Sequence, residues 1–459
     1  METELAAGFP TLLKQCSIPV MKTPLSLVPA LLLGSMLLDF PLCAADSGLR
    51  ERLADAHAIG ADHWIYNDLD KAKAEARKWN KPIFVTFRCV PCKNCASFDA
   101  EVAQGSELIR TLAQTHFVAL RQVEMKGVDL SQFQFDHDLN WAAMFINPDG
   151  TVYGRYGTQS ASGPDAFNSI ASLERAMMRA LALHAAYPKN QAELTPKHGK
   201  DKPYKTAFDM PGLDQKEKLR GQTERGNCIH CHNIHDAEQN QARLAGVPNS
   251  AFLERWPLPD NVGVHIDPQD GAKIERVSID TPAAKAGLKA GDMVTHVDGQ
   301  PIISIADIQW VLHNISGGKA SVLFTVTRGG KDLTHRLSLS PGWKKGDISW
   351  RGSMWSLRPR PGYWAREMKP DEVAAANVPA GIKPTKVQVL NGNQPQGKAA
   401  KDAGLRTGDV IVGVDDKPLT MSPAEFNVYV RLQHKVGDRL KLTVLREGRE
   451  EKITFPLVE

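Results

Sequence analysis

The chain has 459 residues, with 56 basic and 52 acidic side chains and a formal net charge of +4 at pH 7. This length predicts three or four domains, and 42% hydrophobic residues supply apolar material for several cores. The near balance of charge, without a basic stripe, excludes nucleic acid as the leading class of partner.

The N-terminal region predicts an export signal. Met21 is a candidate start, Lys22 supplies a positive charge after it, and an apolar run covers residues 25–38. Small residues suited to cleavage follow at residues 42–45. Because the run is shorter than the ~20 residues of a spanning helix, we expect residues 1–44 to be a signal peptide rather than an uncleaved anchor. The mature protein is then exported, in the periplasm or another extracytoplasmic compartment, with no membrane contact beyond the signal.

The next distinctive segment is a predicted buried strand followed by three cysteines. The strand covers residues 83–87, and Cys89, Cys92 and Cys95 follow at three-residue spacing where a helix is expected to begin. A thiol at a helix N-terminus has a lowered pKa, because it feels the positive end of the backbone dipole. The order of strand, cysteines and helix is typical of thiol–disulfide exchange.

This segment resembles the active-site region of the thioredoxin fold. Residues 64–82 resemble the helix that enters the first central strand, and residues 145–150 resemble a later strand and turn. The resemblance aligns Cys92 and Cys95 with the active pair. It implies that Cys92 attacks a disulfide and Cys95 resolves the product, with Cys89 as a second resolving or regulatory thiol.

Three positions depart from the thioredoxin pattern. Thr86 occupies the place of a buried Asp used in proton transfer, Trp141 occupies the place of the cis-proline, and Lys93-Asn94 replaces Gly-Pro between the cysteines. These departures leave open a non-catalytic alternative, in which the three cysteines bind a soft metal ion such as Cu(I) or Zn(II).

The first domain is expected to cover residues 46–187 as a thioredoxin-like α/β sandwich. Residue types and spacing predict further strands over residues 116–125, 141–147 and 151–156, and a closing helix over residues 164–186. A polar stretch rich in Lys, Asp, Gln and Pro then predicts an exposed linker over residues 188–226.

A second chemical motif, Cys228-Ile-His-Cys231-His232, lies in the linker region, which we assign to residues 188–260. Cys-x-x-Cys-His is the attachment sequence of c-type haem, in which Cys228 and Cys231 form thioethers and His232 binds the iron. We therefore expect covalently bound haem c as the one candidate cofactor. A plain disulfide and a zinc half-site completed by His235 are the alternatives.

The C-terminal half contains an internal repeat, because residues 286–292 recur as residues 403–409 with the pattern Ala-Gly-Leu-x-x-Gly-Asp. A strand and a turn follow each copy. Each copy then has a predicted helix and a β hairpin, at residues 304–314 and 320–339 in the first and at residues 423–432 and 439–457 in the second.

The repeat resembles PDZ domains of the bacterial type, which are partly open β-barrels. We expect two such domains, residues 261–341 and 360–459, joined by a connector at residues 342–359. The resemblance implies that a peptide C-terminus binds the backbone of a glycine-containing loop and adds as a strand. In the first copy this loop consists of Val262, Gly263, Val264, His265 and Ile266. The matching loop of the second copy is at residues 361–364.

Taken together, these segments predict a multidomain α+β protein, and they resemble a family of exported thioredoxin/PDZ-domain (seleno)proteins. The family resemblance implies a thiol–disulfide redox protein that recruits protein C-termini through its PDZ domains and acts on thiol or disulfide substrates. The alternative is a non-catalytic PDZ adaptor or a soft-metal-binding protein. No Ser/His/Asp arrangement accompanies the repeats, so a protease site is not expected.

Overall fold

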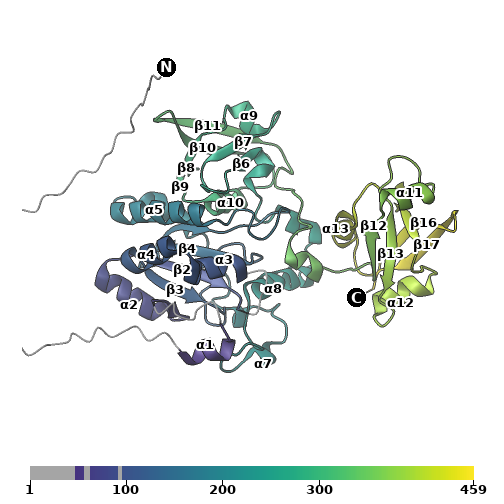
Figure 1. Cartoon of the computed structure of the whole chain (residues 1–459), viewed down its shortest axis with the longest axis horizontal. Coiled ribbons are helices and arrows are strands. Elements are labelled where there is room, and N and C mark those ends of the chain that lie inside the picture. The colour runs from purple at the N-terminus through teal and green to yellow at the C-terminus, as the bar shows by residue number, and fades with distance from the viewer. Residues whose placement is uncertain (1–46, 56–62, 91–95, 459) are drawn as a thin grey trace, which may run out of the picture. The chain divides into compact units, whose positions relative to one another are not determined.

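The computed structural model describes residues 47–55, 63–90 and 96–458, and the structural statements below refer to these ranges. These ranges fall in the unit of the chain formed by residues 43–459, and Figure 1 labels their helices and strands. The predicted signal peptide and two predicted redox thiols, Cys92 and Cys95, lie outside the described residues. Among the helices in these ranges, none combines the length and apolar character that crossing a membrane requires.

The first domain is a five-stranded mixed sheet with strand order β1-β3-β2-β4-β5. Strand β2 pairs in parallel with β3 and antiparallel with β4, so it occupies the centre of the sheet. The elements of this domain are α1 (Ser47–Leu53), β1 (Ile65–Tyr66), α2 (Leu69–Trp79), β2 (Ile83–Arg88), α3 (Ala96–Ala100), the π-helix η3 (Glu101–Gly105), α4 (Glu107–His116), β3 (Val118–Gln122), β4 (Trp141–Ile146), β5 (Val152–Tyr156) and α5 (Ile170–Ala186).

Strand β2 separates two hydrophobic cores, because successive side chains of a strand point to opposite faces of the sheet. Phe84 packs on one side with Ile109 of α4 and Leu173 of α5. Val85 and Phe87 pack on the other side, where α2 covers the sheet. Every residue of β2 is buried, which explains why its sequence is an almost uninterrupted apolar run.

Two boundaries of the first domain differ from the sequence prediction. Helix α4 continues to His116 before the chain turns into β3, so the strand predicted from residue 116 begins at residue 118. Helix α5 begins only after Ser169, whose hydroxyl accepts a hydrogen bond from the backbone N–H of Ser172. The N-cap therefore sets the helix start, whereas residues 164–169 remain non-helical.

The predicted linker at residues 188–226 is mostly exposed, as its polar composition predicts, but it is anchored at a few buried positions. Leu194, Lys197 and Met210 are all buried, and Met210 packs in the core on the α2 side of the sheet. The elements of this region are α6 (Gln191–Leu194), η4 (Thr195–Lys197), η5 (Ala207–Asp209), α7 (Lys216–Leu219), α8 (Cys231–Leu244) and η6 (Asn249–Glu254).

The first repeat forms a four-stranded sheet, β11-β10-β8-β9, and a separate two-stranded sheet, β6-β7. Its predicted hairpin at residues 320–339 is present with the predicted ends. The elements are η7 (Pro259–Val262), β6 (Val264–Ile266), β7 (Ile274–Val277), α9 (Pro282–Ala286), β8 (Met293–Val297), β9 (Gln300–Pro301), α10 (Ile305–Asn314), β10 (Ala320–Arg328) and β11 (Lys331–Leu339).

The connector and the second repeat follow. The sheet of the second repeat has the order β12-β13-β14-β16-β17, with β15 paired to β14, and it is open rather than a closed barrel. The elements are η8 (Gly352–Ser356), β12 (Tyr363–Glu367), α11 (Pro370–Ala375), β13 (Thr385–Leu390), α12 (Pro395–Asp402), β14 (Val410–Val414), β15 (Lys417–Pro418), α13 (Pro423–Gln433), β16 (Arg439–Arg446) and β17 (Arg449–Pro456).

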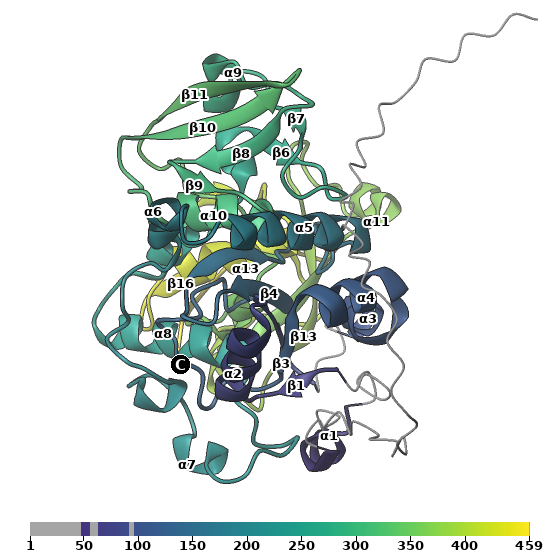
Figure 2. The same cartoon turned by 90° about the vertical axis from the view of Figure 1, so that its left-hand side faces the viewer.

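Helix α10 joins the first repeat to the first domain. Helices α5 and α10 lie between the five-stranded sheet of the first domain and the four-stranded sheet of the first repeat (Figure 1 and Figure 2). The Asp307 carboxylate accepts a hydrogen bond from the backbone N–H of Arg155 on β5 at 3.1 Å and pairs with Lys197 Nζ at 3.0 Å. The Ser304 hydroxyl donates to the backbone oxygen of Arg155 at 2.6 Å. Since Asp307 and Lys197 are both fully buried, the first repeat is held firmly against β5.

Candidate functional site

The first predicted redox thiol lies where the central strand of the first domain ends. Arg88 is the last residue of β2 and pairs with Trp141 on β4, and the half-buried Cys89 follows it. Helix α3 begins after the thiol segment. The predicted strand therefore comes before Cys92 and Cys95, and the predicted helix comes after them. The two cysteines themselves are outside the described residues.

Four buried charged side chains surround the base of the thiol segment. Arg88 Nη1 lies 2.8 Å from Asp55 Oδ1 and 2.8 Å from Asp99 Oδ2. Arg121 contacts the same two carboxylates, with Nη2 2.6 Å from Asp99 Oδ2 and Nε 3.4 Å from Asp55 Oδ2. Removing one member of such a set leaves an uncompensated buried charge and costs roughly 3 to 5 kcal/mol. The network thus fixes the residue before Cys89 and, through Asp99, the helix after the segment.

The two departures from the thioredoxin pattern that fall in the described residues are both buried. Thr86 is 0% exposed, and its hydroxyl has no hydrogen-bond partner among the described residues. The Trp141 indole N–H donates to Asp99 Oδ1 at 3.2 Å, and its ring packs edge-on against Phe98 at 4.9 Å. Neither Thr86 nor Trp141 exchanges a proton near neutral pH, so neither supplies the general base that a buried Asp provides.

The second cysteine motif lies directly against Cys89, although the two are far apart in the sequence. Cys89 Sγ lies 2.9 Å from Nδ1 of His230, which caps the N-terminus of α8 immediately before Cys231. Burial, together with the charge of Cys89, raises the pKa of Cys231 to about 12. Burial and the neighbouring His232 lower the pKa of His230 to about 4, so its ring is neutral at pH 7. The neutral ring is therefore a hydrogen-bond partner of the Cys89 sulfur.

The start of α8 is held in this place by contacts with the first domain. The backbone oxygen of Ile229 accepts a hydrogen bond from the backbone N–H of Met125 at 2.8 Å, and the Ile229 side chain is fully buried. The Asn233 side chain accepts from the backbone N–H of His230 at 2.8 Å, which closes the first turn of the helix. Sequence reasoning missed His230, because no local pattern indicates a contact across 141 positions.

The predicted haem ligands do not share the open space that a porphyrin requires. Cys228 is only 3% exposed, and its thiol donates to the backbone oxygen of Glu224 at 2.9 Å. His232 is exposed and borders a polar cavity that neither cysteine lines. Covalent attachment needs both sulfurs at one edge of the ring and the histidine beneath it. The described residues do not fit a haem, and haem attachment stays a prediction from the sequence.

The alternative zinc half-site also lacks support in the described residues. Within the described ranges, no group of three or more His, Cys, Asp or Glu side chains is arranged to hold a metal ion. His235, the predicted third ligand, instead lines a different cavity together with His137. The soft-metal alternative for the first motif involves Cys92 and Cys95 and therefore falls outside the described residues.

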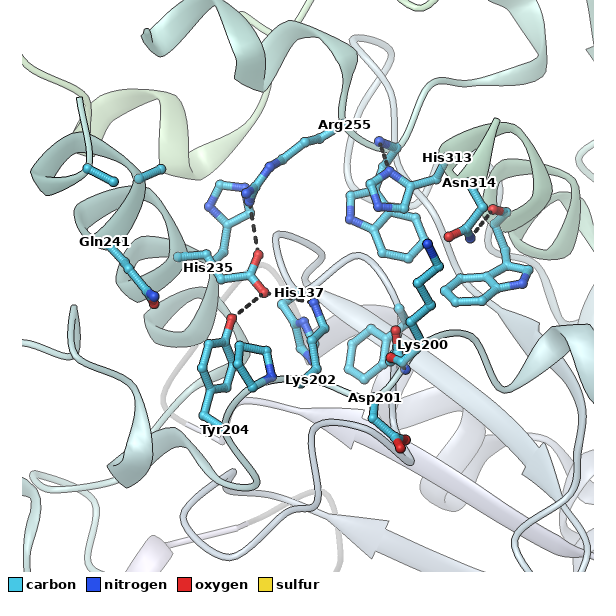
Figure 3. Close-up of a pocket in the computed structure, with 18 residues that line it drawn as sticks. His137, Lys200, Asp201, Lys202, Tyr204, His235, Gln241, Arg255, His313 and Asn314 are labelled. Atoms are coloured by element: carbon cyan, nitrogen blue, oxygen red, sulfur yellow. Dashed lines mark hydrogen bonds and ion pairs between the residues drawn. The ribbon is translucent and has the colours of Figure 1, made fainter. Parts of the chain in front are cut away.

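A separate cavity of about 510 Å³ lies where the first domain, α8 and α10 meet (Figure 3). Glu238 of α8 lies in its wall and contacts Arg255 Nη1 at 2.9 Å, Lys202 Nζ at 3.1 Å and the Tyr204 hydroxyl at 3.2 Å. Burial opposes the charge of this carboxylate, but Arg255 and Lys202 lower the pKa of Glu238 to about 2. The carboxylate is therefore ionised and compensated.

Two buried histidines face the same cavity. Burial lowers the pKa of His137 and of His235 to about 4. Within the described part of the chain, His137 Nε2 and His235 Nδ1 have no hydrogen-bond partner. No cysteine lines the cavity, so it is separate from the thiols. The sequence offered no signal for it beyond His235, because its lining comes from several distant segments without a shared motif.

The predicted peptide loop of the first repeat has the expected backbone. Gly263 has φ +90°, where a side chain would strain the backbone, and an added Cβ would also collide with Thr281. Strand β6 follows and pairs only with β7 among the described strands, which leaves its second edge open for an added strand. His265 lies 2.7 Å from both Asp260 Oδ1 and Ser278 Oγ, while Val262, Val264 and Ile266 are buried.

Comparison with family models identifies the domains. A model described as a PDZ domain matches residues 260–339 and 382–457, and one described as thioredoxin-like matches residues 64–148. The chain is therefore a thioredoxin-like domain followed by two PDZ domains, which confirms the predicted fold.

Curated relatives match parts of the chain. The probable periplasmic serine endoprotease DegP-like of Pseudomonas savastanoi pv. phaseolicola is 31% identical over 198 residues, covering 42% of this chain and 39% of the relative. The protein of the same description from Pseudomonas fulva is 31% identical over 193 residues, covering 41% and 38%. The chain thus spans about two fifths of the length of these relatives. Among solved structures, the HtrA3 PDZ domain bound to a phage-derived ligand (FGRWV) is 23% identical, with a TM-score of 0.18, over 22% of this chain and 85% of that one.

Proposed function

We propose that this protein is an extracytoplasmic thiol–disulfide exchange protein whose PDZ domains recruit substrates by their C-termini. The observation that carries the proposal is the half-buried Cys89 at the end of the central strand of a thioredoxin-like domain. The descriptions of the relatives as periplasmic, together with the predicted signal at residues 1–44, support the compartment.

The proposed reaction is a two-step exchange. The Cys92 thiolate attacks one sulfur of a substrate disulfide, forming a mixed disulfide and releasing the first substrate thiolate. Cys95 then attacks Cys92, which releases the second substrate thiolate and leaves a Cys92–Cys95 disulfide. Two electrons pass from the protein to the substrate, and the protons of the two protein thiols end on the substrate. An external dithiol restores the reduced protein.

The PDZ domains raise the rate by holding the substrate near the thiols. The open edge of β6 and the loop at Gly263 supply the backbone groups that such a peptide needs. A free C-terminal carboxylate is therefore required, and amidation of that carboxylate removes the interaction.

The test is reduction of a peptide that carries one disulfide and a free hydrophobic C-terminus, with dithiothreitol as the reductant. We expect Cys92→Ser to lower the rate at least about 100-fold, because the nucleophile is lost. An amidated copy of the peptide serves as the matched control for recruitment, and its rate at low concentration falls while its rate at saturation does not. If Cys92→Ser reduces the free peptide as fast as the parent, the proposed redox function is wrong.

The second candidate is a PDZ adaptor without thiol chemistry. The buried Thr86, which stands in place of a proton-transferring Asp, favours it. An adaptor binds the free peptide and not the amidated one, and the Cys92→Ser variant binds as tightly as the parent with no reduction by either.

A further inference from the structure

We propose that Cys89 and Cys231 form a second thiol centre, in which the two are oxidised together to a disulfide and His230 holds Cys89 beside the start of α8. The Cys-x-x-Cys-His segment thereby serves as the redox partner of the first motif rather than as a haem anchor. The inference deepens the proposed thiol function and rests on it.

The first support is the contact that joins the two motifs. Cys89 Sγ and His230 Nδ1 are 2.9 Å apart, and Cys231 is the next residue along the chain. The charge of Cys89 contributes to the pKa of Cys231, which places the two sulfurs within electrostatic reach of each other. Cys89 and Cys231 are both half-buried, so a small disulfide can reach them, whereas Cys228 is buried.

The second support is that rigid elements hold both sides of this centre. Arg88, the residue before Cys89, is fixed by its ion pairs with Asp55 and Asp99. On the opposite side, the backbone oxygen of Ile229 is hydrogen-bonded to the first domain, and Asn233 caps the turn that carries the histidine. The contact is therefore built into two packed elements and does not depend on a loose linker.

The chemistry balances with any disulfide RS–SR′ as the oxidant. Cys89 loses its proton to water, the Cys89 sulfur attacks RS–SR′, and R′S⁻ leaves and takes up a proton from water. Cys231 then attacks the Cys89 sulfur, RS⁻ leaves, and the Cys231 proton ends on it. The products are the Cys89–Cys231 disulfide, RSH and R′SH, so two electrons move from the protein to the disulfide.

Cys228 provides a matched control within the same motif. Its thiol is bound to the backbone oxygen of Glu224 and is buried, so it takes no part in the proposed centre. A haem, in contrast, requires Cys228 and Cys231 equally. A plain Cys228–Cys231 disulfide also requires both. Serine variants at these two positions therefore separate the three interpretations.

The experiment uses the full chain with Cys92→Ser and Cys95→Ser, so that no other thiol of the first motif can react. The reduced protein is treated with oxidised glutathione, digested without reduction and analysed by mass spectrometry. We expect a disulfide-linked pair of peptides carrying Cys89 and Cys231. Cys231→Ser abolishes this pair, and Cys228→Ser leaves its yield unchanged.

The role of His230 has its own readout. Asparagine is a good N-cap residue, so His230→Asn keeps the helix start while removing the ring that contacts Cys89. We expect this variant to lose most of the Cys89–Cys231 pair, because Cys89 is no longer held beside the start of α8. An unchanged yield would show that His230 does not position Cys89.

Three results would overturn this inference: a Cys228–Cys231 pair, absence of any linked pair, or a Soret band after expression in a host that matures c-type cytochromes. Failure of the inference and failure of the proposed function are distinguishable. If the parent reduces the peptide, Cys92→Ser does not, and no Cys89–Cys231 pair forms, only the inference is contradicted. A Cys89–Cys231 pair in a protein that never reduces the peptide contradicts only the proposed function.

Discussion

The two PDZ domains contain the same internal Asp–Arg ion pair, which we call the clip. They differ in the role of the acidic residue at one shared helix position. In the first, Asp292 accepts from Arg328, which also donates to the backbone oxygen of Gly287 at 2.9 Å. In the second, the same clip joins Asp409 and Arg446, and Arg446 donates to the backbone oxygen of Gly404 at 2.7 Å. The clip closes the Gly-Leu-x-x-Gly-Asp turn in both copies, so it belongs to the fold itself.

The third residue of the peptide-side helix shows the difference. In α10 this residue is Asp307, which reaches out of its own domain to the buried Lys197. In α13 it is Glu425, which is exposed and folds back to accept from the backbone N–H of Ser422 at 2.7 Å. One acidic side chain docks the first PDZ domain on the thioredoxin-like domain, while the other caps its own helix and pairs with Lys383 of its own domain at 3.9 Å. Docking is therefore a local addition to a shared fold.

The largest effect is expected from removing these two carboxylates in parallel. Asp307→Asn leaves Lys197 and Arg155 without a buried counter-charge and should lower the free energy of unfolding by roughly 3 to 5 kcal/mol. Glu425→Gln removes an exposed capping interaction and an exposed ion pair with Lys383, and it should cost at most about 1 kcal/mol. Urea unfolding of both variants measures the difference. Equal losses would show that the buried Asp307–Lys197 pair does not anchor the first PDZ domain.

Acidification is expected to produce the next largest difference between the two PDZ domains. Burial lowers the pKa of His137 and His235 to about 4 and that of His313 to about 3, and all three line the cavity beside α10. The unfolded chain binds these protons near pH 6.5, whereas the folded chain does not. Stability is therefore complete above pH 6.5 and is lost as the pH falls towards 4, by up to roughly 3 kcal/mol per ring.

Hydrogen exchange at pH 7 and pH 5, corrected for the intrinsic rate, locates this loss. We expect α8 and α10 to lose protection at pH 5, while β16 and β17 of the second PDZ domain keep theirs. A uniform loss over both PDZ domains would instead indicate that the buried histidines are not the cause.

The smallest difference is expected at the clip. Arg328→Ala and Arg446→Ala remove the same clip in the two domains, and Arg446→Ala also removes a surface ion pair with Glu451. Because a surface ion pair contributes little, both variants should lower the melting temperature by similar amounts. Replacing each with lysine should restore part of the loss, because the charge remains while the two-pronged geometry is lost. Scanning calorimetry of the four variants provides the check, and a large effect in only one domain would contradict a shared role.

Local patterns in the sequence were sufficient for the elements but not for the contacts between them. The buried run at residues 83–87 and the hairpin at residues 320–339 were predictable, because period and turn residues act over a few positions. Lys197 illustrates the limit. It lies in a polar stretch that predicts exposure, yet it is buried because its partner, Asp307, lies in another domain.

The candidate site shows the same division. The three-residue cysteine spacing and the Cys-x-x-Cys-His motif could be recognised, because each is a short pattern with known chemistry. That Cys89 meets His230 depends on how Ile229 packs in the core of the first domain, and no single segment encodes this. The cavity around Glu238 was missed for the same reason.

The buried network of Asp55, Arg88, Asp99 and Arg121 makes the thiol end of β2 insensitive to ionic strength. Mobile ions screen charges only where water reaches them, over about 8 to 10 Å at physiological salt. The side chains of the network are at most 1% exposed, whereas the Lys441–Asp416 pair of the second PDZ domain is more than half exposed. Added salt therefore weakens the periphery of the molecule and leaves the support beneath Cys89 unchanged, in dilute and concentrated surroundings alike.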